Sequence, residues 1–395
     1  MTGDIERPRA ADATGLSPPA SLPPVLYVGD HFGYPSGVAH GVTVYLLNVL
    51  PELRKAGLDL NSCFLREPHP AAAPLVAAGM APTFLSAAPW NPFVVLQVAA
   101  LARRHGCGLI HAAGLKAVLV ARIVARLTGA RVVVHVHDQI MPGAALRALH
   151  RLFSSATDVG VCVSAATRPV AVEGYHVAPD RVRVAHNGLD LARLHNLPAG
   201  TRARVRGALG LGESQPVLTM VGRLYPIKGT LAMVRMMRPI VDARPDARLL
   251  LVGEGPDRAA CEQLARSLGI AANVLFLGHR GDVPELLAAS DLVVMPSQSE
   301  GLGLAAIEAQ ACGRPVVAYA VGGLPEVVTD GLTGRCVAAG DEPAFVAAVL
   351  ELLGDGERLR RFGAAAATDS ARFGLDRHVA TLLDCFRFAV GREVR

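Results

Sequence analysis

The sequence predicts an α/β protein made of two doubly wound parallel-sheet domains that face a central cleft. Short apolar runs alternate with helical patterns along most of the chain, as in parallel sheets covered by helices on both faces. The alternation pauses at the turn-forming run 186–190 and at the polar stretch 196–200, which we interpret as the interdomain linker, and then it restarts. A length of 395 residues suits two such domains.

The elements of the first half follow from these runs in chain order. Each strand is a short apolar run typical of a buried parallel strand, and several helices end at a glycine. Residues 68–92 are rich in proline and alanine and show no clear pattern, while Ser164 has the side chain of a helix N-cap. The expected strands are 25–28, 58–65, 109–112, 132–136, 159–163 and 182–185, and the expected helices are 38–55, 93–105, 115–128 and 142–154.

The second half repeats the alternation and ends in a long helix. Its expected strands are 217–221, 249–252, 274–277, 292–295 and 316–319, with helices between them. We assign residues 1–21 to a disordered tail, 22–190 to an N-terminal domain, 191–375 to a C-terminal domain and 376–395 to the terminal helix. Ligands of open α/β sheets bind outside the carboxyl ends of the strands, so the cleft between the domains is the expected site.

Composition narrows the class of protein. The formal charge of +5 is small for this length and does not indicate a nucleic-acid partner. The seven cysteines never form a C-x-x-C pair, which argues against a disulfide framework and a zinc site. No apolar run reaches the roughly 18 residues of a membrane span, and residues 1–21 lack the apolar core of a signal peptide. We therefore expect a protein of the cytoplasm or of a membrane surface.

The stretch 291–325 organises the expected site. The apolar run 292–295 ends at Pro296, a polar turn follows, and Gly301-Leu302-Gly303 lets the backbone approach a ligand closely. The helix 304–311 then begins at Leu304, and its N-terminal N–H groups point at whatever lies above the sheet. Two carboxylates, Glu300 and Glu308, flank this turn with seven residues between them.

Two other interpretations compete for this stretch. Glu308 could lie on a solvated helix face, but its neighbours are mainly alanines and no basic residue follows at helical spacing. The run 301–306 also matches the G-x-G-x-x-G/A fingerprint of dinucleotide-binding folds. That fingerprint requires an acid about 20 residues later, and the window 317–323 contains none.

A second motif carries cations. Arg223 and Lys228 follow the strand 217–221 and open a helix, and Lys228 is one of only three lysines in an arginine-rich chain. A diphosphate leaving group needs cations and N–H donors nearby because charge grows on its oxygens. Arginine offers a bidentate fork and lysine a compact point charge, so the pair suits a diphosphate.

The ordered run of these motifs resembles a known family. Glu300-x7-Glu308, followed by Gly313-x-Pro315-Val316-Val317 and by the run 322–328, closely resembles the donor-site signature of retaining family 4 glycosyltransferases, which have the GT-B fold. The resemblance extends from about residue 25 onward, and Arg223-x4-Lys228 matches the family's phosphate-binding pair. It implies that the terminal helix crosses back to the first domain.

The resemblance also implies roles for individual residues. Glu300 would hold hydroxyls of the transferred sugar, Glu308 the ribose, and His137 would lie beside the anomeric carbon. Ser36-Gly37 resembles the family's glycine loop, although Ser36 replaces a glycine. The implied catalytic set is His137, Arg223, Lys228 and Glu300; the implied donor-binding set is Gly37, Arg223, Lys228, Glu254, His279, Glu300, Gly301, Leu302, Gly303, Leu304 and Glu308.

Other polar clusters have open interpretations. His135, His137 and Asp138 at a strand end could bind a metal, but the Asp-x-Asp pair usual for a nucleotide-bound metal is absent, so we expect no metal and no cofactor. His111 could border the acceptor side. The helix 142–154 has basic and apolar residues that could rest on an anionic membrane, although its pattern favours an ordinary packed helix.

These inferences predict a retaining, metal-independent glycosyltransferase. The donor would be a nucleoside-diphosphate sugar, with UDP favoured over GDP, and the acceptor a hydroxyl of a glycoconjugate, lipid-linked or small molecule. The alternatives are a sugar-nucleotide epimerase or phosphorylase on the same fold, or a nucleotide-sugar binding protein without turnover.

Overall fold

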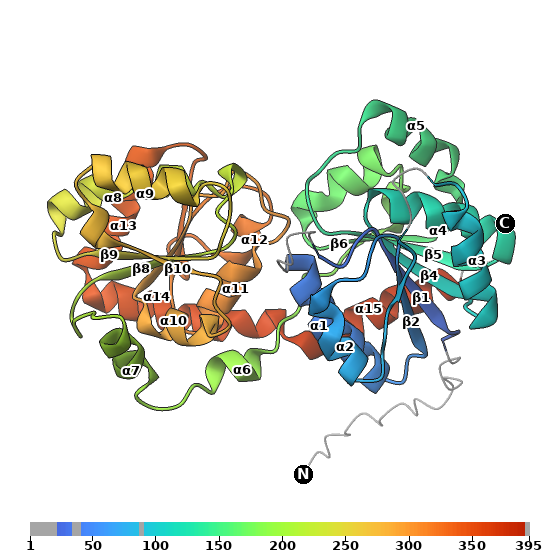
Figure 1. Ribbon diagram of the computed structural model, residues 1–395, viewed down its shortest axis with the longest axis horizontal. Helices are drawn as coiled ribbons and strands as arrows, with labels where there is room; N and C mark the ends of the chain where they lie inside the picture. The colour runs from blue at the N-terminus through green and yellow to red at the C-terminus, as the bar shows by residue number, and fades with distance from the viewer. Residues whose placement is uncertain (1–21, 34–40, 87–90, 392–395) are drawn as a thin grey trace, which may run out of the picture.

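The computed structural model describes residues 22–33, 41–86 and 91–391. The tail 1–21 and the loop residues Ser36 and Gly37 lie outside them. Within the described part the chain forms two domains that lie side by side, each a parallel sheet with helices on both faces (Figure 1). The α/β fold of two doubly wound domains predicted from the sequence is confirmed.

The first sheet has seven strands in the order β3-β2-β1-β4-β5-β6-β7. Helices α3 and α4 cover one face, while α1 and α2 cover the other. The strands are β1 (Val25–Gly29), β2 (Leu60–Phe64), β3 (Thr83–Phe84), β4 (Leu109–Ala113), β5 (Arg131–Val136), β6 (Val159–Cys162) and β7 (Val182–Val184); the helices are α1 (Gly41–Lys55), α2 (Ala73–Ala77), α3 (Val94–Arg104), α4 (Leu115–Thr128) and α5 (Ala144–Leu152).

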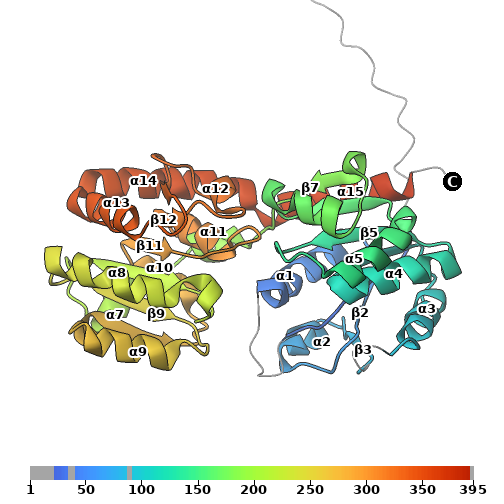
Figure 2. The ribbon, with the colours of Figure 1, turned by 90° about the horizontal axis from the view of Figure 1, so that it is seen from above.

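The second sheet has six strands in the order β10-β9-β8-β11-β12-β13. Its strands are β8 (Val217–Val221), β9 (Arg248–Val252), β10 (Val274–Gly278), β11 (Leu292–Met295), β12 (Val316–Tyr319) and β13 (Gly334–Val337). The helices of this half are α6 (Leu191–His195), α7 (Thr201–Ala208), α8 (Thr230–Ala243), α9 (Arg258–Ser267), α10 (Val283–Ala289), α11 (Leu304–Ala311), α12 (Leu324–Val327), α13 (Glu342–Gly354), α14 (Gly356–Asp369) and α15 (Leu375–Val390). Helices α8, α9 and α13 pack on one face, and α7, α10 and α11 on the other (Figure 2).

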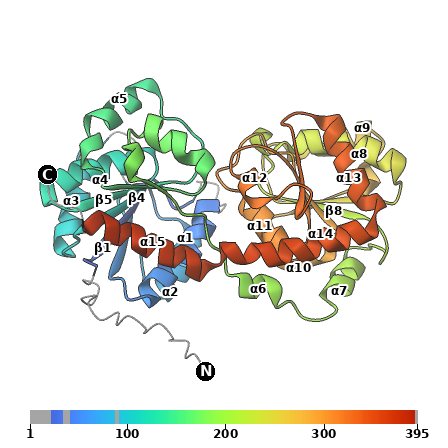
Figure 3. The same ribbon diagram turned by 180° about the vertical axis from the view of Figure 1, so that it is seen from behind.

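The last helix leaves the second half and packs on the first sheet. Figure 3 shows α15 running across the back of the first domain. Leu382 and Phe386 of α15 are fully buried in the same apolar cluster as Val25 of β1 and Tyr45 of α1. Every strand of both sheets pairs in parallel, so the strands of each sheet end at the same edge. The carboxyl-end edges of the two sheets can therefore face a common cleft.

The chain crosses between the sheets twice at one place. Leu189 on the way out pairs with Gly374 on the way back as a parallel β-bridge. The chain therefore crosses to the second domain before the stretch 196–200, where we expected the linker. Helix α6 already packs on α11, and Leu194 is buried among residues of the second half. Stretch 68–92, expected to lack a pattern, contains α2 and the two-residue edge strand β3.

Helix α5 departs from the expected ordinary packed helix. Its residues Ala144, Ala145, Arg147, Ala148, Leu149, Arg151 and Leu152 are exposed, and only His150 is fully buried. In Figure 1 the helix projects from the top of the first domain, away from the sheet. Within the described residues no helix is both long and apolar enough to span a bilayer.

Candidate active site

A cavity of about 660 Å³ lies between the two sheets and is lined by residues of both. Its walls include the loops after β1, β5, β8 and β11, as expected for ligands that bind at the carboxyl ends of parallel strands. The described residues of the implied site all line it: His137, Arg223, Lys228, Glu254, His279, Glu300, Gly301, Leu302, Gly303, Leu304 and Glu308. Gly37 lies outside the described residues.

Lys228 and Glu300 form an ion pair on the wall of this cavity. Lys228 Nζ lies 2.6 Å from Glu300 Oε1, and the hydroxyl of Ser297 donates to the same oxygen at 2.9 Å. The side chains are 22% and 11% exposed, so this pair is much less hydrated than a surface salt bridge. The two residues are 72 positions apart in the chain, and the loops after β8 and β11 bring them together.

A glycine at the start of α8 sets the position of the lysine loop. Gly229 has φ +72°, and a Cβ there would lie 2.0 Å from the carbonyl oxygen of Pro296. Only glycine allows this approach, which brings the loop of Lys228 against the end of β11. Gly229 therefore allows the preceding Lys228 to reach Glu300.

The remaining charges at the second-domain wall are held by local contacts. The Arg223 guanidinium carbon lies 4.8 Å from the centre of the Tyr225 ring, a cation–π distance. Glu254 pairs with Arg258 one turn later at 2.7 Å, and Arg280 pairs with Asp282 at 2.6 Å. Glu254 thus lines the cavity while its carboxylate already has a cationic partner.

Helix α11 points its N-terminus into the cavity. It begins after Gly303, whose φ is +99°, and a Cβ at that position would lie 2.6 Å from the Leu324 side chain. Glu308, in the second turn, keeps limited solvent contact in apolar surroundings. Burial raises the pKa of the Glu308 carboxyl to about 7, and the charge of Arg193 opposes this only in part. Without a ligand, Glu308 is therefore about half protonated near neutral pH and largely protonated below it.

Histidine rings fill the first-domain wall. His135 and His137 stack with centroids 4.0 Å apart, and His135 Nδ1 lies 3.0 Å from His111 Nε2. Tyr45 packs edge-on to His137, and its hydroxyl lies 2.9 Å from Nε2 of His378 on α15. Burial lowers the pKa of His111 to about 3 and that of His378 to about 4, so these rings are neutral. The stack fixes the orientation of His137 at the cavity wall.

The expectation that His111 borders the acceptor side is wrong. His111 is 2% exposed and lies behind His135, with its ring against Phe386 of α15, and it does not line the cavity. The open metal interpretation of the neighbouring histidines gains no support: no three His, Cys, Asp or Glu side chains among the described residues gather as metal ligands would.

Hydrogen bonds join the two halves along one edge of the cavity. The carboxylate of Glu326 accepts the backbone N–H groups of Ala165 and Ala166 at 2.9 and 3.0 Å, and it lies 2.9 Å from His186 Nε2. The Ser164 hydroxyl donates to the Gly301 carbonyl at 2.6 Å. We call these the closure contacts.

Gly301 belongs to the same edge. A Cβ on Gly301 would lie 2.0 Å from the carbonyl oxygen of His137, so glycine is required for the two walls to meet. Burial alone would raise the pKa of Glu326, but the hydrogen bonds from His186, Ala165 and Ala166 hold it below its usual value. The closure contacts therefore use an ionised carboxylate.

Comparison with known families matches both halves. Residues 201–369 match the model described as glycosyl transferases group 1, and residues 39–193 match that of glycosyltransferase family 4. The chain belongs to the family 4 glycosyltransferases. The motifs 223–228 and 300–308 both lie within the first of these matches.

Curated proteins with similar sequences are also glycosyltransferases. The D-inositol 3-phosphate glycosyltransferases of Segniliparus rotundus and Streptomyces coelicolor are 36% and 38% identical over 222 and 241 residues, each match covering 55% of this chain. The matches cover 49% and 52% of those relatives, so this chain spans about half their length.

Two solved structures share the fold. Anabaena HepE in complex with UDP has a TM-score of 0.80 at 22% identity, over 91% of this chain and 98% of that chain. A glycosyltransferase of Rickettsia africae has a TM-score of 0.81 at 19% identity, over 93% of this chain and 99% of that one. Both likenesses concern the GT-B fold alone.

Sequence reasoning missed Asp30 and Asn187 of the first-domain wall and considered Asp138 only as a possible metal ligand. Asp30 and Asp138 line the cavity, and burial raises the pKa of the Asp30 carboxyl. Asp30 accepts the Ala117 N–H at 2.6 Å and so caps α4. Asn187 is 6% exposed, and its Oδ1 has no hydrogen-bond partner within the described part of the chain. The available signal was position, since Asp30 and Asp138 follow strand ends.

The closure contacts predict a local effect of Glu326→Gln. Losing the charge should weaken at least one charge-assisted hydrogen bond, worth about 1.5–3 kcal/mol. We expect the Ala165 and Ala166 amides to exchange roughly tenfold faster or more in hydrogen-exchange mass spectrometry, while both cores keep their protection. Glu342→Gln, which removes the half-buried partner of Arg235 at a site far from Ala165 in the chain, is the control. Unchanged exchange at Ala165 would contradict the assignment.

Proposed function

We propose that this protein transfers a sugar, with retention of configuration and without a metal, from a UDP-sugar to an acceptor hydroxyl. The observation that carries the proposal is the Lys228–Glu300 pair beside the N-terminus of α11 in the interdomain cavity. A lysine, an arginine and a helix N-terminus can together stabilise a departing diphosphate. Glu300 lies next to that point and can hold hydroxyls of the sugar.

The choice of UDP is supported by structures of HepE with UDP, with UDP and glucose, and with UDP-glucose. The names of the curated relatives supply the first acceptor to test, D-inositol 3-phosphate. The experiment incubates the protein with UDP-sugars or GDP-sugars, with and without this acceptor, and analyses products by mass spectrometry. A glycosylated acceptor plus nucleoside diphosphate is expected. An isomerised sugar nucleotide without acceptor consumption would indicate an epimerase instead.

Retention gives a stereochemical prediction. As the resemblance to retaining family 4 enzymes implies, we expect attack from the same face as the departing phosphate, which takes the acceptor proton. Proton NMR of the first product formed should show the anomeric configuration of the donor. An inverted product would contradict the proposal at its mechanistic centre.

Metal independence is a second expectation. The sequence lacks an Asp-x-Asp pair, and Arg223 and Lys228 supply the positive charge that a metal would otherwise provide. Activity should therefore survive EDTA. Complete loss of activity with EDTA, restored by manganese or magnesium, would show that these side chains do not replace a metal.

A further inference from the structure

Helix α5 presents an apolar face to solvent. At 100° per residue, Ala145, Ala148, Leu149 and Leu152 lie within an arc of about 100°. Leu149 and Leu152 are 40% and 65% exposed, and the preceding Ile140 is 60% exposed. Exposed apolar residues that lie next to one another, unlike scattered ones, can mark an interaction surface.

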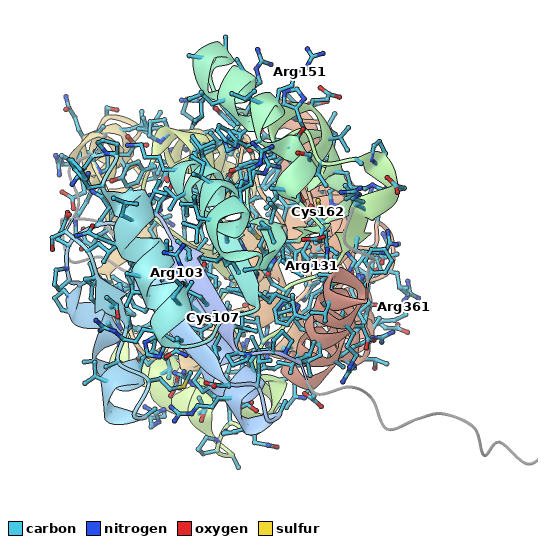
Figure 4. All side chains as sticks on the ribbon, turned by 90° about the vertical axis from the view of Figure 1, so that its right-hand side faces the viewer. Arg103, Cys107, Arg131, Arg151, Cys162 and Arg361 are labelled. Atoms are coloured by element: carbon cyan, nitrogen blue, oxygen red, sulfur yellow. The ribbon has the colours of Figure 1, made fainter. Side chains whose placement is uncertain are left out.

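Arginines lie beyond the Ala148 side of this stripe. At 100° per residue, Arg151 is about 60° and Arg147 about 100° around the helix from Ala148, and both are exposed. Figure 4 shows Arg151 at the top of the molecule, pointing away from the domain. Arg126 of α4 lies at the other end, 4.9 Å over the ring of Phe153 just after α5. Among the described residues none of the three is ion-paired, and no residue from 140 to 155 is acidic. The long stems of these side chains can bury their methylenes while keeping the charge in water.

A buried arginine holds α5 in this outward position. Arg122 is fully buried and donates to the carbonyl oxygens of His150 at 3.0 Å and Tyr175 at 2.7 Å, and to the Thr157 hydroxyl at 2.8 Å. These bonds attach the C-terminal end of α5 to α4 and to the turn at Tyr175. The exposed face is therefore a fixed feature of the fold and not a loosely attached helix.

The stripe continues to the mouth of the cavity. Ile140 lines the cavity while most of its side chain is exposed, and it lies between Asp138 and α5. Met141 packs against Gly174, where a Cβ would lie 3.1 Å from its sulfur. A surface that covers α5 would thus also cover one entrance to the cavity.

We propose that the Ile140–Leu152 face docks on an anionic lipid membrane. The face is a projecting helix and not a groove, so it suits insertion into the interfacial region of a bilayer. Its apolar stripe supplies area to bury, and Arg126, Arg147 and Arg151 supply attraction to anionic headgroups. Docking would turn the cavity entrance at Ile140 toward the membrane surface.

The test measures co-sedimentation of the whole protein with vesicles, without donor or acceptor. Vesicles of phosphatidylcholine alone are compared with vesicles that also contain phosphatidylglycerol. We expect binding to the anionic vesicles and weakening by added salt. This experiment measures membrane binding and not sugar transfer. A protein that does not bind vesicles can still be a glycosyltransferase, and a protein that transfers no sugar can still bind vesicles.

Two double variants probe the face. Arg147→Gln with Arg151→Gln should lower the partition coefficient about fivefold for each arginine removed. Leu149→Ser with Leu152→Ser should lower it at least about tenfold, because both side chains lose buried apolar area. The matched controls are Arg104→Gln with Arg361→Gln and Val76→Ser with Leu96→Ser, all exposed positions outside α5. Both controls should bind as the unchanged protein does.

Other outcomes would overturn the proposal. Absence of binding to anionic vesicles, or equal loss in the controls, would show that this face does not recognise a membrane. Sedimentation velocity without vesicles tests a third possibility. If the unchanged protein is a dimer and the variant Leu149→Ser with Leu152→Ser is a monomer, the face is an interface between two copies of the chain and not a membrane-docking surface. Circular dichroism of each variant confirms that a lost binding signal comes from a folded protein.

Discussion

Replacing Lys228 by alanine should lower turnover roughly ten- to a hundredfold or more. A charge-assisted contact is worth about 1.5–3 kcal/mol, and this one should strengthen as negative charge grows on the departing diphosphate. The structure adds a second penalty, because Glu300 would keep its carboxylate next to the diphosphate without the cation 2.6 Å away. Steady-state kinetics with the full donor measures the effect.

Lys55→Ala is a matched control for this prediction. Lys55 also pairs with a glutamate, Glu52, at 2.7 Å, but its side chain is 72% exposed and its pair lies outside the cavity. Turnover of this variant should stay within about twofold of the unchanged protein. Equal losses in the two variants would refute the phosphate role of Lys228. Adding Glu300→Gln to Lys228→Ala should recover part of the nucleotide affinity, since it removes the repulsive charge.

Glu308→Gln should weaken UDP binding by about tenfold or more near pH 8. The ribose does not change during the reaction, so a carboxylate that holds it contributes equally to ground and transition states and affects binding more than chemistry. Glu300→Gln should instead leave UDP binding nearly intact and lower turnover, because UDP has no sugar for Glu300 to hold. Calorimetric titration of UDP into both variants, beside saturation kinetics, measures the difference.

The raised pKa of Glu308 makes this prediction dependent on pH. If ribose hydroxyls bind the ionised carboxylate, UDP affinity should rise about tenfold between pH 6 and pH 8, since the pKa of about 7 must be passed. Binding near neutral pH should release a proton, which titrations in buffers of different ionisation enthalpy detect. Glu308→Gln should abolish this release, and subtraction removes any proton lost by UDP itself.

The raised pKa of Glu308 also predicts how the stability of the folded protein changes with pH. A carboxyl whose folded pKa is raised binds more protons in the folded state, so the unliganded protein should lose stability as pH rises from about 4.5 through about 7. Glu308→Gln should remove this component of the pH dependence of melting temperature. Indistinguishable profiles for the two proteins would mean that Glu308 is not protonated in the way its environment indicates.

The sequence was most informative where burial is complete. Strand β11 and helix α11 have the same bounds as predicted, because an apolar run between parallel neighbours and an alanine-rich helix between glycines leave little choice. The edge strands β3 and β13 were missed: β3 has two residues, and β13 contains Arg335 and Cys336, which are half-buried. Edge strands need less apolar surface, so their signal is weaker.

Contacts between distant residues could not be predicted in the same way. The sequence indicated that Lys228 and Glu300 share one site, but not that they touch. Nothing local indicated that Glu326 would accept N–H groups from Ala165 and Ala166, 160 positions or more away. The exposure of α5 was also missed, because a helix with leucines at helical spacing looks the same whether a neighbour covers it or not.

The return of α15 to the first sheet has a consequence for synthesis on the ribosome. Val379, Leu382 and Phe386 complete the apolar cluster on the face that α1 also covers, and α15 packs there on β5 and β6, so that part of the face stays open until α15 has been translated. The second domain carries its own core from Val205 to Phe373 and can fold first. Ribosome-bound chains that end at residue 374, followed by a linker long enough to fill the exit tunnel, should therefore yield a protease-resistant second domain and a protease-sensitive first one. Extending the chain through α15 should protect both.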